Sequence, residues 1–222
     1  MDNDRIVQLE LSFLSGSVYD RKLALDELAK CPSDIVVPIL QRLTASSDFL
    51  CRRFAVMGLG NHLTDESFQV LTDLLAKEHD DNVLAEIADT LFGFGDRALP
   101  LLRDLFVRNQ NWLIRQTIIS IFMDSDREDI LLEIIRQALL DPTQTIRETA
   151  ILALGQLLNG QYEEESLDLL TELANAEVWC DRWRTATVLS KSSNPRAKLL
   201  LAKLRQDENH SVVAAALEAD LP

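Results

Sequence analysis

The chain has 222 residues, of which 47% are hydrophobic, and its 36 acids against 22 Lys and Arg give a formal net charge of −14. The apolar content excludes a disordered chain, and the acidic balance disfavours nucleic acid as a partner because its phosphates repel such a surface. No apolar run approaches the roughly 20 residues that span a bilayer, so no membrane insertion is expected.

Amphipathic helical patterns follow one another along the whole chain. The first helix of each pair carries apolar residues at positions i, i+3, i+4 and i+7, as one face of a helix requires. In chain order these first helices are DRIVQLELSFL, DIVVPILQRL, ESFQVLTDLLAK, DRALPLLRDLFV, DREDILLEIIRQALL, EEESLDLLTELANA and PRAKLLLAKLR. Together with a second helix, each forms a repeat unit, and the units are predicted over residues 1–30, 31–61, 62–94, 95–124, 125–159, 160–191 and 192–222.

The second helix of each unit repeats certain residues at fixed offsets from one anchor position. Arg147 is followed after three, seven and eight residues by Ala, Leu and Gly, and Arg52 is followed by the same residues at the same offsets. Weaker copies extend the series of anchors to Arg21, Arg52, Ala85, Arg115, Arg147, Arg182 and Val213. The glycine is expected to stop the helix in a left-handed conformation. The arginine is expected to bond to an Asp or a carbonyl of a neighbouring repeat.

These repeats determine the predicted fold class. A single helix pair cannot bury its own apolar face, so successive pairs must stack and share one continuous core. The sequence therefore predicts one all-α domain, residues 1–222, folded as a right-handed α-solenoid of about seven helix pairs.

The clearest second helix, Asp141–Gly155, resembles a known family of repeats. Its pattern DP-xxx-IR-xx-A-xxx-LG is similar to the second helix of HEAT repeats. Pro38 and Pro100 stand in the apolar setting in which that family places a proline in its first helix, and their recurrence predicts a shared kink. The short period most resembles the HEAT-like repeats of phycobilin lyase subunits and of phycobilisome-degradation proteins of cyanobacteria.

The sequence offers little support for catalysis. His62, His79 and His210 fall in different repeats without metal-ligand spacing. Deoxyhypusine hydroxylases, a di-iron HEAT-repeat class, carry His-Glu pairs that this sequence lacks, and HEAT-like DNA glycosylases need a basic groove. We therefore expect no catalytic residues, no metal and no cofactor. Widely spaced cysteines and a start without the features of a signal peptide predict a cytoplasmic protein.

Binding is the better supported expectation, because the second helices of a solenoid line one extended, concave surface. Positions one and five after each anchor should face it, since the core takes positions three, four and seven. The predicted partner-binding residues are Arg53, Met57, Glu86, Gln116, Glu148, Leu152 and Trp183, together with Trp179, Arg182 and Arg184 around Trp183. Trp183 is the strongest candidate, because large aromatic side chains are enriched at interface hot spots. For Trp179 and Trp112, which precede their anchors by three residues, a structural role is the preferred interpretation.

Together these observations predict a non-catalytic protein-binding scaffold or chaperone-like assembly factor, and the resemblance implies a link to phycobilisomes. The resemblance also implies an alternative, a phycobilin lyase subunit that attaches a bilin to a phycobiliprotein, with a second HEAT-like subunit as partner. The bilin propionates would then need Arg53, or Arg182 and Arg184 beside Trp183. A third interpretation is delivery of a metallocentre, which would act through a partner because the chain carries no cluster motif.

Overall fold

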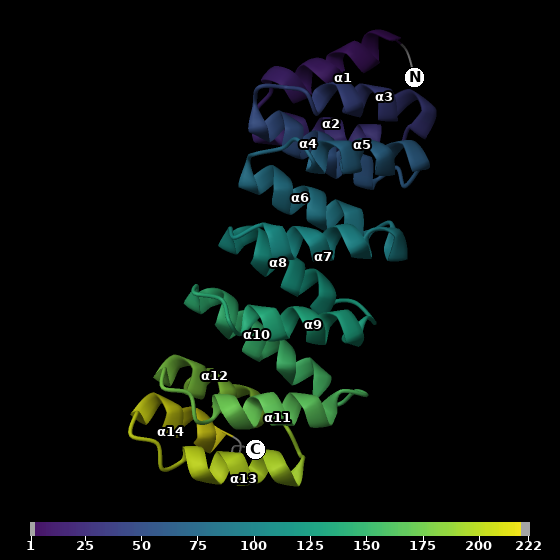
Figure 1. Cartoon of the computed structure of the whole chain (residues 1–222). Coiled ribbons are helices and arrows are strands. Elements are labelled where there is room, and N and C mark those ends of the chain that lie inside the picture. The colour runs from purple at the N-terminus through teal and green to yellow at the C-terminus, as the bar shows by residue number, and fades with distance from the viewer. Residues whose placement is uncertain (1–2, 219–222) are drawn as a thin grey trace. The chain divides into compact units, whose positions relative to one another are not determined.

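The computed structural model of the chain describes residues 3–218 (Figure 1). Fourteen α-helices, one short 3-10 helix and no strand occur within this range, so the predicted all-α class and its seven helix pairs are confirmed. The chain divides into two units, Met1–Ile118 and Ile119–Pro222, with the boundary inside α8. A single domain over residues 1–222 stays a prediction.

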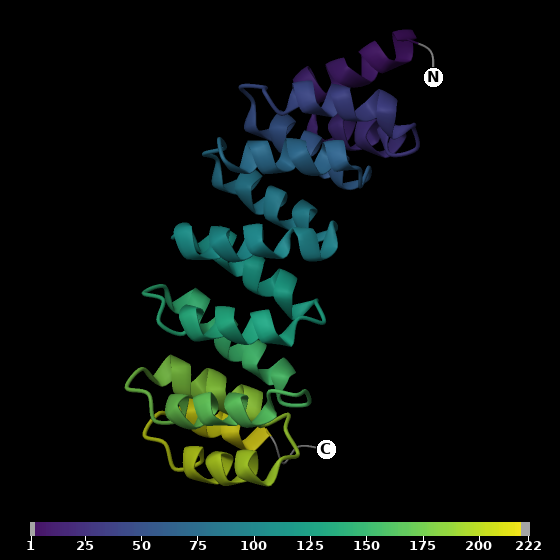
Figure 2. The same ribbon diagram turned by 45° about the vertical axis from the view of Figure 1, so that its right-hand side comes forward.

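Unit 1 holds the first three helix pairs, the first helix of the fourth, and part of α8. Its helices are α1 (Asn3–Ser15), α2 (Val18–Leu28), α3 (Ser33–Leu43), α4 (Phe49–Gly60), α5 (Asp65–Leu75), α6 (Asp81–Phe92), the 3-10 helix η1 (Gly95–Arg97), α7 (Leu99–Arg108) and α8 (Trp112–Met123). The second helices α2, α4 and α6 pack side by side, and the first helices α1, α3 and α5 form another row (Figures 1 and 2).

Unit 2 holds the last three pairs. Its helices are α9 (Glu128–Ala138), α10 (Gln144–Leu157), α11 (Glu163–Leu173), α12 (Trp179–Leu189), α13 (Pro195–Leu204) and α14 (His210–Leu217). The second helices α10, α12 and α14 again pack side by side, and α11 lies against α13. Each unit thus repeats the same two-row packing, in which the apolar faces of neighbouring pairs cover one another.

Short polar residues set the starts of many second helices. Asp48, Asp80 and Asn209 each accept a hydrogen bond from the backbone N–H two residues ahead, at 3.0, 2.9 and 2.9 Å. Such side chains satisfy donors that the first helical turn leaves free. In α4, α6 and α14 this cap sets the start of the helix a few residues before its anchor.

The repeated glycines do not have the predicted left-handed conformation. Within residues 3–218, a positive φ occurs only at Gly95, in the turn after α6. Gly60 is the last residue of α4, and Gly155 lies inside α10. A Cβ on Gly155 would stand 3.2 Å from a methyl group of Val188 on α12. The residue therefore serves close approach of two second helices and does not end a helix.

The two prolines of the first helices also differ from each other. Pro38 lies inside α3, as the resemblance implied. Pro100 lies in the first turn of α7, where its missing N–H would have no helical partner in any case. A kink shared by both helices is therefore not supported, because a proline in the first turn does not bend a helix.

Candidate functional site

The second helices present the predicted alternation of buried and accessible positions in both units. The side chain three residues after the anchor is buried in all seven second helices. At positions one and five the predicted residues are exposed or half-buried, except Thr90, which is buried. The structure therefore confirms which side of each second helix faces the core and which side is accessible. That the accessible side binds a partner stays a prediction.

The anchor arginines hold neighbouring repeats together. Arg52 donates at 2.9 and 3.2 Å to two backbone oxygens of the loop before α4, and at 2.7 and 2.9 Å to the Glu78 carboxylate of the next repeat. Arg147 makes the same kinds of contact in unit 2, with Asp181 as the acid. The expected bond to an acid of the neighbouring repeat is thus confirmed. The carbonyls come from the arginine's own repeat, which differs from the expectation.

Arg182 belongs to this structural set, which corrects its placement on the partner-binding surface. Only 8% of the residue is exposed, and it donates to the Asp207 carboxylate at 2.7 and 3.0 Å. It also donates to two backbone oxygens of the preceding loop, at 2.9 and 3.0 Å, and to the Glu208 carboxylate at 3.3 Å. The hydrogen bond from Arg182 lowers the pKa of Asp207 below its ordinary value. This guanidinium is fully engaged within the protein.

In unit 1, Arg53 and Glu86 meet across α4 and α6. The Arg53 Nε donates to the Glu86 carboxylate at 2.9 Å, and the Glu86 side chain is only 12% exposed. Burial raises the pKa of Glu86 above its ordinary value, although the bond from Arg53 opposes this shift. Two of the predicted partner-binding residues therefore form an ion pair with each other at this point of the surface.

Met57 lies in a separate hollow between α2 and α4. The space measures about 460 Å³ and also touches Lys22 and Asp26, which are joined by a 2.8 Å ion pair along α2. Gln116, the next predicted residue of unit 1, is half-buried on α8. These residues offer a mainly polar surface with one flexible apolar side chain.

In unit 2, three predicted residues form one cluster. Arg184 on α12 donates to the Glu148 carboxylate on α10 at 2.7 Å, and its guanidinium carbon lies 4.1 Å from the centroid of the Trp183 ring. Glu148 also accepts a bond of 2.6 Å from Gln144. These contacts hold the half-buried Trp183 ring in place between a cation and the surface of α12.

A hollow of about 390 Å³ adjoins the cluster, one to two turns further along the same helices. It is lined by the apolar residues Leu152, Gly155, Leu158 and Val188 and by the polar residues Gln156, Asn159, Thr187, Lys191 and Ser192. We call this hollow, together with Glu148, Leu152, Trp183 and Arg184, the α10–α12 groove. Among the residues that line the hollow, only Leu152 and Thr187 lie five positions after an anchor, where the sequence predicts a surface residue.

Trp179 and Trp112 are both exposed. A wedge between helices would bury the ring, so their positions favour a surface role over the structural interpretation. Trp179 lies at the first position of α12, one turn before Trp183. It extends the aromatic surface of unit 2 beyond the α10–α12 groove.

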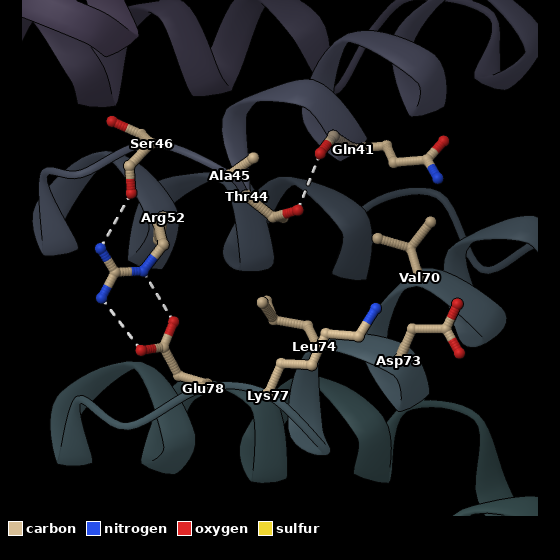
Figure 3. Close-up of a pocket in the computed structure, with 10 residues that line it drawn as sticks. All are labelled: Gln41, Thr44, Ala45, Ser46, Arg52, Val70, Asp73, Leu74, Lys77 and Glu78. Atoms are coloured by element: carbon tan, nitrogen blue, oxygen red, sulfur yellow. Dashed lines mark hydrogen bonds and ion pairs between the residues drawn. The ribbon is translucent and has the colours of Figure 1, made fainter.

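Another pocket lies at residues for which the sequence predicts no binding role. It lies between the C-terminal ends of α3 and α5 and measures about 480 Å³, with the Arg52–Glu78 ion pair at one side and Asp73 and Lys77 at the other (Figure 3). The corresponding space between α9 and α11 in unit 2 measures about 370 Å³ and is lined mainly by leucines, among them the exposed Leu140. Residues from two different first helices form each space, so no offset within one repeat points to it.

Residues 3–218 hold no group of three or more His, Cys, Asp or Glu side chains arranged to bind a metal ion. Over the same residues, none of the helices has the length and apolar character needed to cross a membrane.

A comparison with known protein families identifies the family of the chain. A model of HEAT repeats matches residues 11–91, 36–123, 99–182 and 129–221, so the chain belongs to the HEAT-repeat family. No curated protein matches it. The family assignment agrees with the arginine contacts and the stacked pairs described above.

Several solved structures are similar at low sequence identity. An engineered protein of the Northeast Structural Genomics Consortium is 16% identical, with a TM-score of 0.51 over 96% of this chain; the match covers 66% of that protein, slightly less than two thirds. The complex of CpcE and CpcF of phycocyanin lyase from Nostoc sp. PCC7120 is 16% identical, with a TM-score of 0.49 over 96% of this chain and 92% of that one. A designed armadillo repeat protein in complex with the peptide (KR)4 is 16% identical, with a TM-score of 0.35 over 96% of both chains. The first of these likenesses shows a shared fold.

Proposed function

We propose that this HEAT-repeat chain is a protein-binding scaffold without catalytic chemistry of its own, and that its partner lies across the α10–α12 groove. The observation that carries the proposal is the cluster of Trp183, Arg184 and Glu148 beside the hollow at Leu152. An aromatic ring held by fixed charged groups, next to a hollow of mixed apolar and polar lining, is a composition found at protein interfaces, where aromatic and Arg side chains are enriched at hot spots.

The finer form of the proposal is a chaperone-like assembly factor that holds a phycobiliprotein. It rests on the short repeat period, which resembles that of the HEAT-like repeats of phycobilin lyase subunits and phycobilisome-degradation proteins. A chaperone-like factor of this kind would hold the phycobiliprotein in the α10–α12 groove.

A lyase subunit that binds a bilin receives less support from the geometry. Arg53, Arg182 and Arg184, the residues expected to hold the propionates, each already pair with a carboxylate of this chain. A bilin would have to displace those carboxylates. Titration of the protein with free bilin, followed by its visible absorption, separates the two functions, because only a bilin-binding protein shifts the spectrum.

The test of the scaffold proposal is quantitative capture of partners from native lysate by three immobilised proteins. Leu152→Glu places a charge in the α10–α12 groove, and Leu199→Glu places the same charge on α13, where Leu199 is 73% exposed against 38% for Leu152. We expect Leu152→Glu to reduce capture of the main partner at least tenfold, a loss of about 1.4 kcal/mol or more. Leu199→Glu should capture as much as the wild type. Equal capture by all three proteins would place the binding surface elsewhere.

A further inference from the structure

The first helix pair exposes an unusual amount of apolar surface. Six large side chains from α1 and the first turns of α2 are between 47% and 69% exposed: Val7, Leu11, Leu14, Val18, Tyr19 and Leu23. On α1 they recur at i, i+4 and i+7, which is one continuous stripe of a helix. We call these six residues the N-terminal apolar face.

This face points away from the rest of unit 1. The opposite side of α1 carries the buried Leu9 and Phe13, and α1 packs through it on α2, α3 and α4. Both ribbon views show α1 as the outermost helix of unit 1, with the other helices on one side only (Figures 1 and 2). None of the described residues covers the stripe. A contiguous exposed apolar surface of several hundred Å² marks an interaction site.

The last helix pair, by contrast, has a largely polar exterior. Within its described residues the exposed large apolar side chains are Leu199 and Leu217, and Lys198 and Lys203 are also exposed. The N-terminal apolar face therefore has no apolar counterpart there. Head-to-tail association would join unlike surfaces, whereas two N-terminal faces match each other across a two-fold axis.

We propose that the N-terminal apolar face is the interface of a two-fold homodimer. The six side chains expose roughly 600 Å² in one copy, which is most of the ~800 Å² that each partner contributes to an interface of standard size.

The test is the molar mass of the 222-residue protein by sedimentation equilibrium over a range of concentrations. We expect the wild type to approach twice 25.0 kDa as its concentration rises. Leu11→Glu should raise the dimer dissociation constant at least about a hundredfold, because each copy loses a leucine and brings a carboxylate to the apolar interface. Leu199→Glu carries the same charge change on α13 and should dimerise like the wild type.

Three outcomes would overturn the proposal. The first is a wild type that remains at 25.0 kDa at every concentration, which would assign the face to a different protein. The second is equal weakening by both substitutions, which would indicate a general charge effect. The third is a ladder of species larger than the dimer, which would indicate head-to-tail association. Circular dichroism of Leu11→Glu checks that this variant folds. Leu152→Glu should dimerise like the wild type, because Leu152 lies in the α10–α12 groove and not on the N-terminal apolar face.

Discussion

Arg184 on α12 donates a hydrogen bond of 2.7 Å to the carboxylate of Glu148 on α10. The two side chains are 21% and 18% exposed, so this pair is far better shielded from water than the Lys22–Asp26 pair along α2. The same guanidinium lies over the Trp183 ring. A single ion pair thus joins two second helices and fixes the aromatic edge of the α10–α12 groove, which gives a partner a preformed surface.

The coupling between these two charges should be measurable. In a double-mutant cycle with Glu148→Gln and Arg184→Gln, urea unfolding is expected to give a coupling energy of about 1–2 kcal/mol. The same cycle with Lys22→Gln and Asp26→Asn should give less than about 0.5 kcal/mol, because those charges are solvated. Equal coupling energies would mean that the shielding of the Glu148–Arg184 pair has no energetic consequence.

Arg182→Leu is expected to lower the free energy of unfolding by about 3–5 kcal/mol. The substitution leaves the buried Asp207 carboxylate and two backbone oxygens without their donor. Arg196→Leu, which removes an arginine from a more exposed ion pair with Asp168, serves as the control and should have a much smaller effect. Urea unfolding followed by circular dichroism measures both. A similar loss in the two variants would argue against a structural role for Arg182.

Glu86 should make the protein less stable as the pH rises. Because its pKa is raised in the folded state, the folded protein holds the proton more tightly than the unfolded chain. The stabilisation is present below the ordinary Glu pKa of about 4.3 and is lost as the pH rises through the raised value. Glu86→Gln removes this dependence, so its unfolding free energy should change less over that range than that of the wild type.

The control for this pH series is Glu66→Gln, which removes an exposed carboxylate from α5. Urea unfolding at several pH values between about 4 and 7 compares the three proteins. Parallel curves for the wild type and Glu86→Gln would show that burial does not shift the titration of Glu86.

Two glycines should respond to alanine in opposite directions. At Gly58 a Cβ would lie 2.8 and 2.9 Å from the methyl groups of the buried Leu40, so Gly58→Ala is expected to destabilise by about 1–3 kcal/mol. At Gly93, which caps α6 with φ −58°, the nearest atoms would be 3.4 and 3.5 Å away. Gly93→Ala should stabilise by about 0.5–1 kcal/mol through loss of chain entropy in the unfolded state. Thermal unfolding distinguishes the signs, and a shift in the same direction for both would refute the packing argument.

The sequence predicts the helix pairs well because their pattern is local. The 3.6-residue periodicity and the fixed offsets from Arg52 and Arg147 lie within single helices, and the burial of Ala55 and Ala150 follows from them. The structural role of the anchor arginine was also foreseen in outline, because a buried guanidinium needs partners wherever it recurs.

Features that depend on two repeats at once were predicted poorly. Gly155 looks like a helix end in the sequence, and its use for close packing is visible only once Val188 stands beside it. Arg182 was grouped with its surface neighbours although it occupies the anchor position, and the loop that holds Asp207 decides its burial. The pockets between successive first helices arise in the same way, from residues about thirty positions apart.

The most direct test of the central claim is site-specific photo-crosslinking with p-benzoylphenylalanine in place of Leu152, and of Leu199 as the control. Both positions are exposed leucines of unit 2, one in the α10–α12 groove and the other on α13. A scaffold that seats its partner in the groove predicts one discrete crosslinked species from position 152 and none from position 199, with the partner's peptides identified by mass spectrometry. Crosslinks of equal yield from both positions, or from position 199 alone, would contradict it.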